Sequence, residues 1–277
     1  MDIMTFNSRL HSIQKHSHSL LCVGLDTDAK KVPAHLQSKK NVVLEFNKQI
    51  IEATKDAACA YKINFAFYEG LGKEGWEIIE KTRAMIPSSI LTIADAKRGD
   101  IGNSSSYYAG AILNTMGFDS ITVAPYMGDD SVAPFLQWKE KGVFLLALTS
   151  NEGAYDFQYK KVGKKRLFEE IVVTAQRWMK LGNLGFVVGA TKSKDIQSVR
   201  KLAPSSPFLV PGIGAQGGNL EDVVKYGCSK DGFGVLVNAS RSILYASNGK
   251  DFAEAAGNEA VRLRDEINLL RKKLFKT

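Results

Sequence analysis

Eight short apolar runs alternate with longer amphipathic segments along this chain of 277 residues. The runs have the length of buried strands, whereas the segments between them repeat their apolar side chains with a helical period. Consecutive parallel strands need a crossover connection, usually a helix, so this order indicates a parallel sheet. The predicted strands cover residues 20–25, 60–63, 90–94, 120–124, 143–148, 185–188, 208–210 and 232–237.

The number of strand–helix repeats further restricts the folds that are possible. Eight strand–helix units in a chain of this length indicate an α/β protein of the (β/α)8 or TIM barrel type, and an open doubly wound sheet is the alternative. No linker interrupts the pattern, so we predict a single domain over residues 1–277, with a helical extension at 1–19 and a C-terminal helix at 251–277. The predicted helices cover residues 42–58, 76–86, 105–116, 132–141, 168–181, 194–202, 219–226 and 252–274.

Two segments fall outside this repeat. The N-terminal extension is polar and carries His11, His16 and His18, and we expect it to form a solvated helix. The longest connection, residues 150–166, is too polar for a core, and we expect a mobile loop over the functional site.

Composition and charge restrict the partners of the chain. The net charge of +8 comes from dispersed basic residues without a nucleic-acid-binding motif, and affinity for small phosphorylated anions explains it equally well. No apolar run is long enough to span a membrane, and the first residues lack the apolar stretch of a secretory signal. The cysteines, Cys22, Cys59 and Cys228, are too scattered for a disulfide framework or a zinc site. We therefore expect a cytoplasmic protein without nucleic-acid or membrane partners.

Charged residues gather at the end of the third predicted strand. Asp95 and Lys97 are two residues apart, so they project from the same face of a strand, and Asp100 follows in the next loop. A surface ion-pair cluster is the ordinary interpretation of such a pattern. Lys62 argues against it, because a lysine within an apolar strand is rarely buried without a partner. If Lys62 reaches the same layer, the four side chains form a row of alternating charge.

This row has a bearing on metal binding. Two aspartates could bind Mg²⁺, but two ammonium groups between them already supply positive charge. Two carboxylates would also keep both amines protonated at neutral pH. We therefore expect neither a metal nor an organic cofactor at this site.

A second set of residues predicts a phosphate site. The glycine-rich segment 211–218 follows the seventh strand and includes Gln216, and Arg241 follows the eighth strand. Loops after these two strands are the usual phosphate-binding loops of such barrels. Glycines let backbone N–H groups approach the phosphate oxygens, and an arginine offers a bidentate fork. Asp26 ends the first strand and Ser150 ends the fifth, where ligand-binding groups are expected.

These motifs closely resemble those of the orotidine 5′-phosphate decarboxylases, in the mycobacterial-type (type 2) branch. The resemblance extends from residue 20 to about residue 245. It depends on five segments, namely Gly24-Leu25-Asp26, Tyr61-Lys62-Ile63-Asn64, Asp95 to Asn103, Pro211 to Gly218, and Ser240-Arg241.

The resemblance implies a barrel that converts orotidine 5′-monophosphate to UMP and CO₂ in de novo pyrimidine biosynthesis, with Lys97 as the proton donor to C6. Lys62, Asp95, Lys97 and Asp100 match the charged catalytic tetrad. Asp100 would come from the neighbouring subunit of a homodimer, together with Ile101 and Ser104. The resemblance also implies substrate contacts: Asp26, Lys62 and Asn64 at the ribose, Ser150 at the pyrimidine, and Gln216, Ser240 and Arg241 at the phosphate.

The chain departs from the family pattern at two places. Ser104 stands where many members carry threonine, and Asn238-Ala239-Ser240 replaces a glycine often found before the arginine.

Two other functions are alternatives to this interpretation. A sugar-phosphate decarboxylase or aldolase that uses Mg²⁺ on the same barrel is one alternative. A non-catalytic barrel that binds a nucleotide or RNA is the other.

Overall fold

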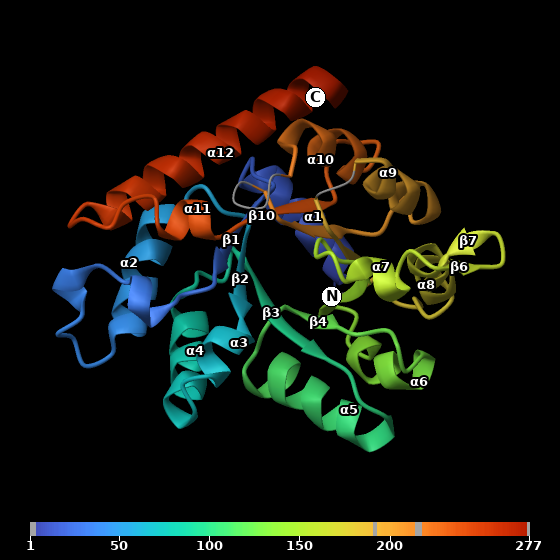
Figure 1. Ribbon diagram of the computed structural model, residues 1–277, viewed down its shortest axis with the longest axis horizontal. Coiled ribbons are helices and arrows are strands. Elements are labelled where there is room, and N and C mark those ends of the chain that lie inside the picture. Colours follow the sequence, from blue (N-terminus) through green and yellow to red (C-terminus); the bar gives the residue numbers. More distant parts are fainter. Residues whose placement is uncertain (1–3, 191–192, 214–217, 276–277) are drawn as a thin grey trace.

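Eight parallel strands close into a barrel in this computed structural model, which describes residues 4–190, 193–213 and 218–275. Helices surround the strands as a ring (Figure 1). The predicted (β/α)8 barrel is therefore confirmed. In their order around the barrel, the strands are β1 (Leu21–Leu25), β10 (Val235–Ala239), β9 (Phe208–Pro211), β8 (Leu184–Val188), β5 (Gly142–Leu148), β4 (Ser120–Val123), β3 (Leu91–Arg98) and β2 (Ala60–Asn64).

The helices agree with the predicted positions over most of the chain. The long ones are α2 (Val42–Thr54), α4 (Lys73–Met85), α8 (Leu167–Gln176), α9 (Ser193–Leu202), α10 (Leu220–Gly227) and α12 (Phe252–Phe275). After β3, α5 (Gly102–Ala109) continues into a π-helical segment, Gly110–Thr115. Short helices complete the chain: α3 (Phe65–Glu69), α6 (Asp129–Val132), α7 (Ala154–Phe157) and α11 (Arg241–Leu244).

Several predicted boundaries and one predicted loop differ from the structure. The last strand begins at Val235 instead of residue 232, because Gly232 and Gly234 adopt positive φ and form a turn. The helix predicted over 132–141 is reduced to α6 and a 3₁₀ turn that ends at Leu136. Residues 150–166 are more ordered than a plain loop, since they contain α7 and the hairpin of β6 (Lys161–Val162) and β7 (Lys165–Arg166).

The N-terminal helix α1 (Phe6–His16) is not simply solvated, as the sequence had suggested. Its Phe6 and Leu10 are buried in a cluster with residues that point into the barrel, and Phe6 packs edge-on against Phe144 of β5. Gln14 donates a hydrogen bond to the backbone carbonyl of Val235. This helix therefore closes one end of the barrel, and Figure 1 shows it lying across the strands. The opposite face of α1 does meet solvent, where His16 is exposed.

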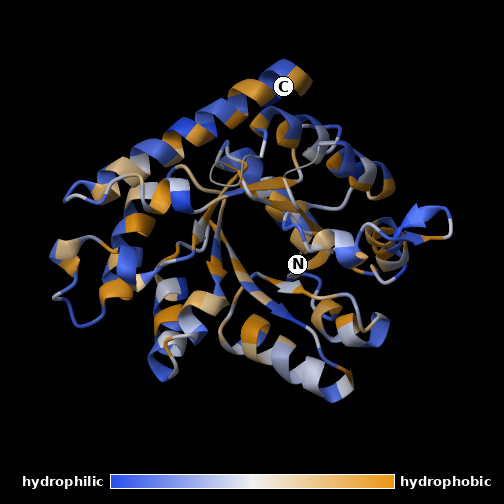
Figure 2. Cartoon of the chain, viewed as in Figure 1, coloured by the Kyte–Doolittle hydropathy of each residue, from blue (hydrophilic) through white to orange (hydrophobic). Residues whose placement is uncertain are grey.

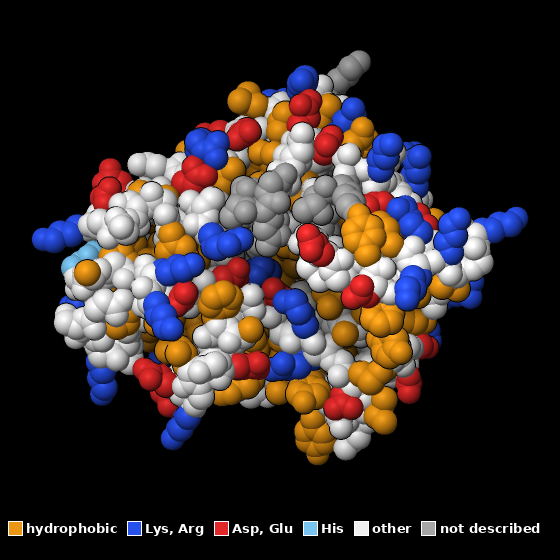
Figure 3. All heavy atoms as spheres, in the orientation of Figure 1, with side chains coloured by type: hydrophobic (Ala, Val, Ile, Leu, Met, Phe, Trp, Pro, Cys, Tyr) orange, Lys and Arg blue, Asp and Glu red, His pale blue; other side chains and the backbone are white. Residues whose placement is uncertain are grey.

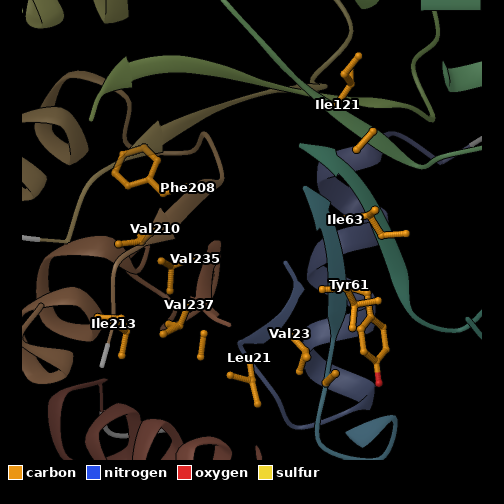
Figure 4. Packing of buried hydrophobic residues seen from close by; sticks show 14 of the residues in the cluster. Leu21, Val23, Tyr61, Ile63, Ile121, Phe208, Val210, Ile213, Val235 and Val237 are labelled. Carbon is orange, nitrogen blue, oxygen red and sulfur yellow. The ribbon is translucent and has the colours of Figure 1, made fainter. Parts of the chain in front are cut away.

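The larger core lies between the strands and the surrounding helices. Alternate strand residues such as Val23, Ile63 and Val237 point outward into it (Figure 4). The helix α12 covers part of this layer, and its apolar residues recur every three or four positions, as Figure 2 shows by the alternation of colour along it. The charged side chains Lys62, Asp95 and Lys97 lie toward the carboxyl ends of β2 and β3. No described helix is long and apolar enough to cross a bilayer.

Candidate active site

A cavity of about 340 Å³ opens at the carboxyl ends of the barrel strands. Figure 3 shows basic and acidic side chains close together around the hollow at the centre of this face. The side chains come from most of the strands, as expected where parallel strands converge. The lining residues are Asp26, Lys62, Asn64, Asp95, Lys97, Thr122, Leu146, Thr149, Ser150, Asn151, Val187, Leu209, Pro211, Gly212, Ile213, Asn238, Ser240 and Arg241.

Lys62 is the buried centre of the charged groups. It lies on β2, only 3% exposed, and its Nζ is 3.1 Å from Asp26 Oδ1 and 3.1 Å from Asp95 Oδ2. Burial disfavours the ammonium, but the two carboxylates outweigh this penalty and raise the pKa of Lys62 above its ordinary value. Lys62 is therefore a permanent cation.

Asp95 connects the buried lysine to an exposed one. Its Oδ1 lies 2.7 Å from Lys97 Nζ, and its Oδ2 contacts Lys62 Nζ. Burial alone would raise the pKa of Asp95, yet Lys62 and Lys97 lower it to about 2. Asp95 is thus ionised at any physiological pH. The side chain of Lys97 is 51% exposed and faces the cavity.

The backbone around Lys97 is irregular. Lys97 has φ +46°, a left-handed conformation that residues with a side chain rarely adopt. The pairing of β3 with β4 shifts register between Ala94 and Arg98, so Lys97 lies within a β-bulge. Bulges of this kind redirect side chains at barrel rims. The backbone N–H of Lys97 donates to Thr122 Oγ1 at 2.9 Å, and Thr122 Oγ1 donates to Asp95 Oδ1 at 3.0 Å.

Five of the residues predicted to bind substrate line the same cavity. Asn64, Ser150 and Arg241 all face the cavity together with Asp26 and Ser240. Gln216 lies outside the described residues.

Two glycines allow serines of the cavity to pack closely against a neighbouring segment of the chain. The hydroxyl of Ser240 donates to the carbonyl oxygen of Gly24 at 2.9 Å. A Cβ at Gly24 would lie 2.9 Å from the Cβ of Ser240, so only glycine allows this approach. Likewise, a Cβ at Gly189 would lie 2.9 Å from the backbone N of Ser150.

Asp100 does not join the other three charges within this chain. Its carboxylate accepts a hydrogen bond from the N–H of Ile101, and in the described part of the chain it forms no ion pair with Lys62 or Lys97. Ile101 is 62% exposed, and Ser104 is also exposed on α5. Within a single chain the structure therefore brings together three of the four predicted charges, Lys62, Asp95 and Lys97. The fourth member of the cluster is Asp26 instead, which lies on the far side of Lys62.

Comparisons with known proteins identify the family of the chain. Residues 19–256 match the model of the Orotidine 5′-phosphate decarboxylase / HUMPS family. The chain belongs to this family. An orotidine 5′-phosphate decarboxylase of Christiangramia forsetii is 52% identical over 252 residues, which cover 90% of this chain and 92% of that protein. One from Dehalococcoides mccartyi is 48% identical and covers 98% of this chain and 100% of that protein.

Solved structures of family members have the same fold. The Leishmania donovani OMP decarboxylase superposes with a TM-score of 0.84 at 38% identity, covering 97% of this chain and 99% of that one. A putative orotidine-monophosphate decarboxylase of Toxoplasma gondii gives a TM-score of 0.88 at 33% identity, covering 98% of each chain.

Four polar residues of this family member's cavity were not predicted from the sequence. Thr149 and Asn151 flank the predicted Ser150, and Asn238 precedes the predicted Ser240. Thr122 lies on a predicted strand, two residues from its end. Its inward orientation could have been inferred from the apolar neighbours Ile121 and Val123, which must point outward into the core.

Proposed function

We propose that this chain decarboxylates orotidine 5′-monophosphate to UMP and CO₂ without a metal or an organic cofactor. The observation that carries the proposal is the Asp95 carboxylate held between two lysine ammonium groups at the mouth of the barrel. The relatives named orotidine 5′-phosphate decarboxylase, about 50% identical over nearly their full lengths, support the same substrate.

Lys97 is the proposed proton donor. When the bond between C6 and the carboxylate breaks, its electron pair stays on C6 and CO₂ leaves. The Lys97 ammonium stabilises the developing negative charge and then transfers a proton to C6, which gives UMP and a neutral amine that regains a proton from water. Such stabilisation is effective because the charge is already in place before the reaction.

Asp95 acts on the ground state in this proposal. It faces the departing carboxylate of the substrate, and two unit charges about 3 Å apart repel by roughly 5 kcal/mol at an effective dielectric constant of 20. The repulsion disappears as CO₂ leaves. Lys62 keeps Asp95 ionised and in place, because it is buried between Asp95 and Asp26. We assign the larger effect to stabilisation of the transition state by Lys97.

The remaining contacts hold the nucleotide far from the bond that breaks. Asp26, Lys62 and Asn64 are proposed to bind the ribose hydroxyls, and Ser150 the pyrimidine. Ser240 and Arg241 are proposed to bind the 5′-phosphate with Gln216. Binding energy at the phosphate can be used to orient C6 against Lys97.

Asp100 is proposed to complete the site of a partner subunit in a homodimer, with Ile101 and Ser104. The exposed position of Ile101 at the start of α5 supports this, as does Tyr107 on the same helix, which is 74% exposed. Exposed apolar side chains are typical of a contact surface.

The decisive assay follows the loss of absorbance when orotidine 5′-monophosphate is added, with and without EDTA. We expect full activity with EDTA, and no turnover by Lys97→Ala despite normal UMP binding. Activity that EDTA abolishes would favour a sugar-phosphate type enzyme with Mg²⁺, while UMP binding without turnover by the wild type would favour a non-catalytic barrel. Both oxygens of Asp95 already contact Lys62, Lys97 or Thr122, which favours the metal-free reaction.

A further inference from the structure

We propose that Thr122 is a positioning residue for the reaction, because its hydroxyl joins the backbone of Lys97 to the carboxylate of Asp95. This inference rests on the proposed function, since it assigns to Thr122 the task of keeping the proton donor at C6. It needs no contact between Thr122 and the reacting atoms.

The pairing of β3 with β4 places Thr122 opposite the bulge. Ala94 pairs with Ile121, and the next pair is Arg98 with Val123. Three residues of β3, from Asp95 to Lys97, therefore face the single residue Thr122 on β4. The extra residues interrupt the regular ladder of backbone hydrogen bonds at the position where the proton donor lies.

The hydroxyl of Thr122 replaces the missing ladder bond. Thr122 Oγ1 accepts from the Lys97 N–H at 2.9 Å and donates its own proton to Asp95 Oδ1 at 3.0 Å. A hydroxyl has one donor and two acceptor sites, so it can make both bonds at once. Thr122 is only 1% exposed, so its hydroxyl is shielded from water, and both hydrogen bonds are partly buried.

Lys97 needs such an anchor because its backbone is in an unfavourable conformation. A residue with a Cβ persists at φ +46° only when its surroundings hold it there. The side chain of Lys97 is half exposed and bound to one partner, Asp95, so it does not fix the backbone by itself. The hydrogen bond from its backbone N–H to Thr122 holds the backbone of Lys97 directly, between the strand pairs on either side of the bulge.

Loss of the hydroxyl would affect the reacting end of the site alone. Without it, the Lys97 backbone can relax from its left-handed conformation, and Asp95 Oδ1 keeps only its contact with Lys97. The proposed ribose and phosphate contacts come from other strands and loops, among them Asp26 and Arg241. The inference therefore predicts a fall in kcat with little change in nucleotide affinity.

Two substitutions separate the hydroxyl from the shape of the side chain. Thr122→Val keeps the branched shape and the strand preference but removes the hydroxyl, and Thr122→Ser keeps the hydroxyl but removes the methyl group. We expect kcat to fall roughly 30-fold in T122V and less than about threefold in T122S, with KM and UMP affinity within about threefold of the wild type in both. A kcat within twofold of the wild type in T122V, or equal losses in both variants, would overturn the inference.

A measurement without substrate distinguishes this inference from the proposed function. The amide hydrogen of Lys97 should exchange slowly in the free wild type and in T122S, and at least tenfold faster in T122V. Unchanged exchange in T122V would refute the anchoring role whatever the reaction. If T122V does not fold, Thr122→Ala takes its place in both measurements. A wild type that fails to turn over orotidine 5′-monophosphate would refute the proposed function, while the exchange result would still decide the anchoring.

Discussion

Two lysines share the carboxylate of Asp95 but differ in burial, and this difference predicts unequal effects on stability. Lys62 is 4% exposed in its side chain and contacts two carboxylates at 3.1 Å each. Lys97 is 51% exposed and contacts one at 2.7 Å. Lys62→Met and Lys97→Met remove the two charges in turn while keeping side chains of similar length.

The magnitude follows from the contacts of Lys62. Each charge pair at this separation attracts by roughly 5 kcal/mol at an effective dielectric constant of 20, and the cost of burying the ammonium offsets much of the sum. Removing one member of a buried ion pair typically costs about 3–5 kcal/mol, because the remaining charge is left without a partner. The exposed contact of Lys97 is worth only about 0–1 kcal/mol.

Urea unfolding at pH 7, followed by circular dichroism, measures this difference directly. We expect Lys62→Met to lower the free energy of unfolding by about 3–5 kcal/mol and Lys97→Met by at most about 1 kcal/mol, although both lose turnover. Equal losses in the two variants would refute the reasoning, since burial would then not determine the strength of these contacts.

The same unfolding experiment at lower pH tests the protonation state of Asp95. Its pKa is lowered in the folded protein from 3.8 to about 2, so the stability it contributes is complete above its unfolded pKa and is lost as pH falls through the folded value. A shift of this size corresponds to about 2.5 kcal/mol. Without Lys62 the pKa of folded Asp95 should rise toward its unfolded value, so the contribution should be smaller and its loss should be complete at a higher pH. An acid-unfolding curve identical to that of the wild type would contradict this.

Three other predictions concern binding and assembly. Arg241→Ala should raise KM at least tenfold by removing a bidentate phosphate contact, and an unchanged KM in steady-state assays would place the phosphate elsewhere. Gly24→Ala should raise KM by displacing Ser240, which a crystal structure of the variant would show, whereas an unmoved Ser240 would refute the clash. Mixing inactive Asp100→Asn and Lys97→Ala proteins should restore about a quarter of the activity if subunits exchange, since half the dimers would then contain one intact site. No recovery despite proven exchange would argue against a shared site.

Much of the site follows from periodicity alone. Strand residues two apart share a face, and the carboxyl ends of parallel strands meet at one end of a barrel, so Lys62, Asp95 and Lys97 could be placed together before any coordinates. The apolar run before each residue identifies its strand. The same reasoning placed Asp26 and Arg241 at this end of the barrel.

Other features depend on contacts that no local pattern contains. The bulge in β3 arises from its pairing with β4, and it turns Lys97 into a left-handed conformation and sends Asp100 away toward α5. The closure of the barrel by α1 likewise depends on Phe6 meeting Phe144, far away in the sequence.

The sequence by itself determined the barrel, the end at which its chemistry lies and three of the charges there, because hydrophobic periodicity specifies which side of each strand is buried. The tertiary structure decided which groups touch: Asp26 on Lys62, Thr122 between Lys97 and Asp95, and Asp100 apart from them. The physical reason is that strand register and bulges are set by pairing between segments distant in the chain, and a shift of a single residue changes every contact at the rim.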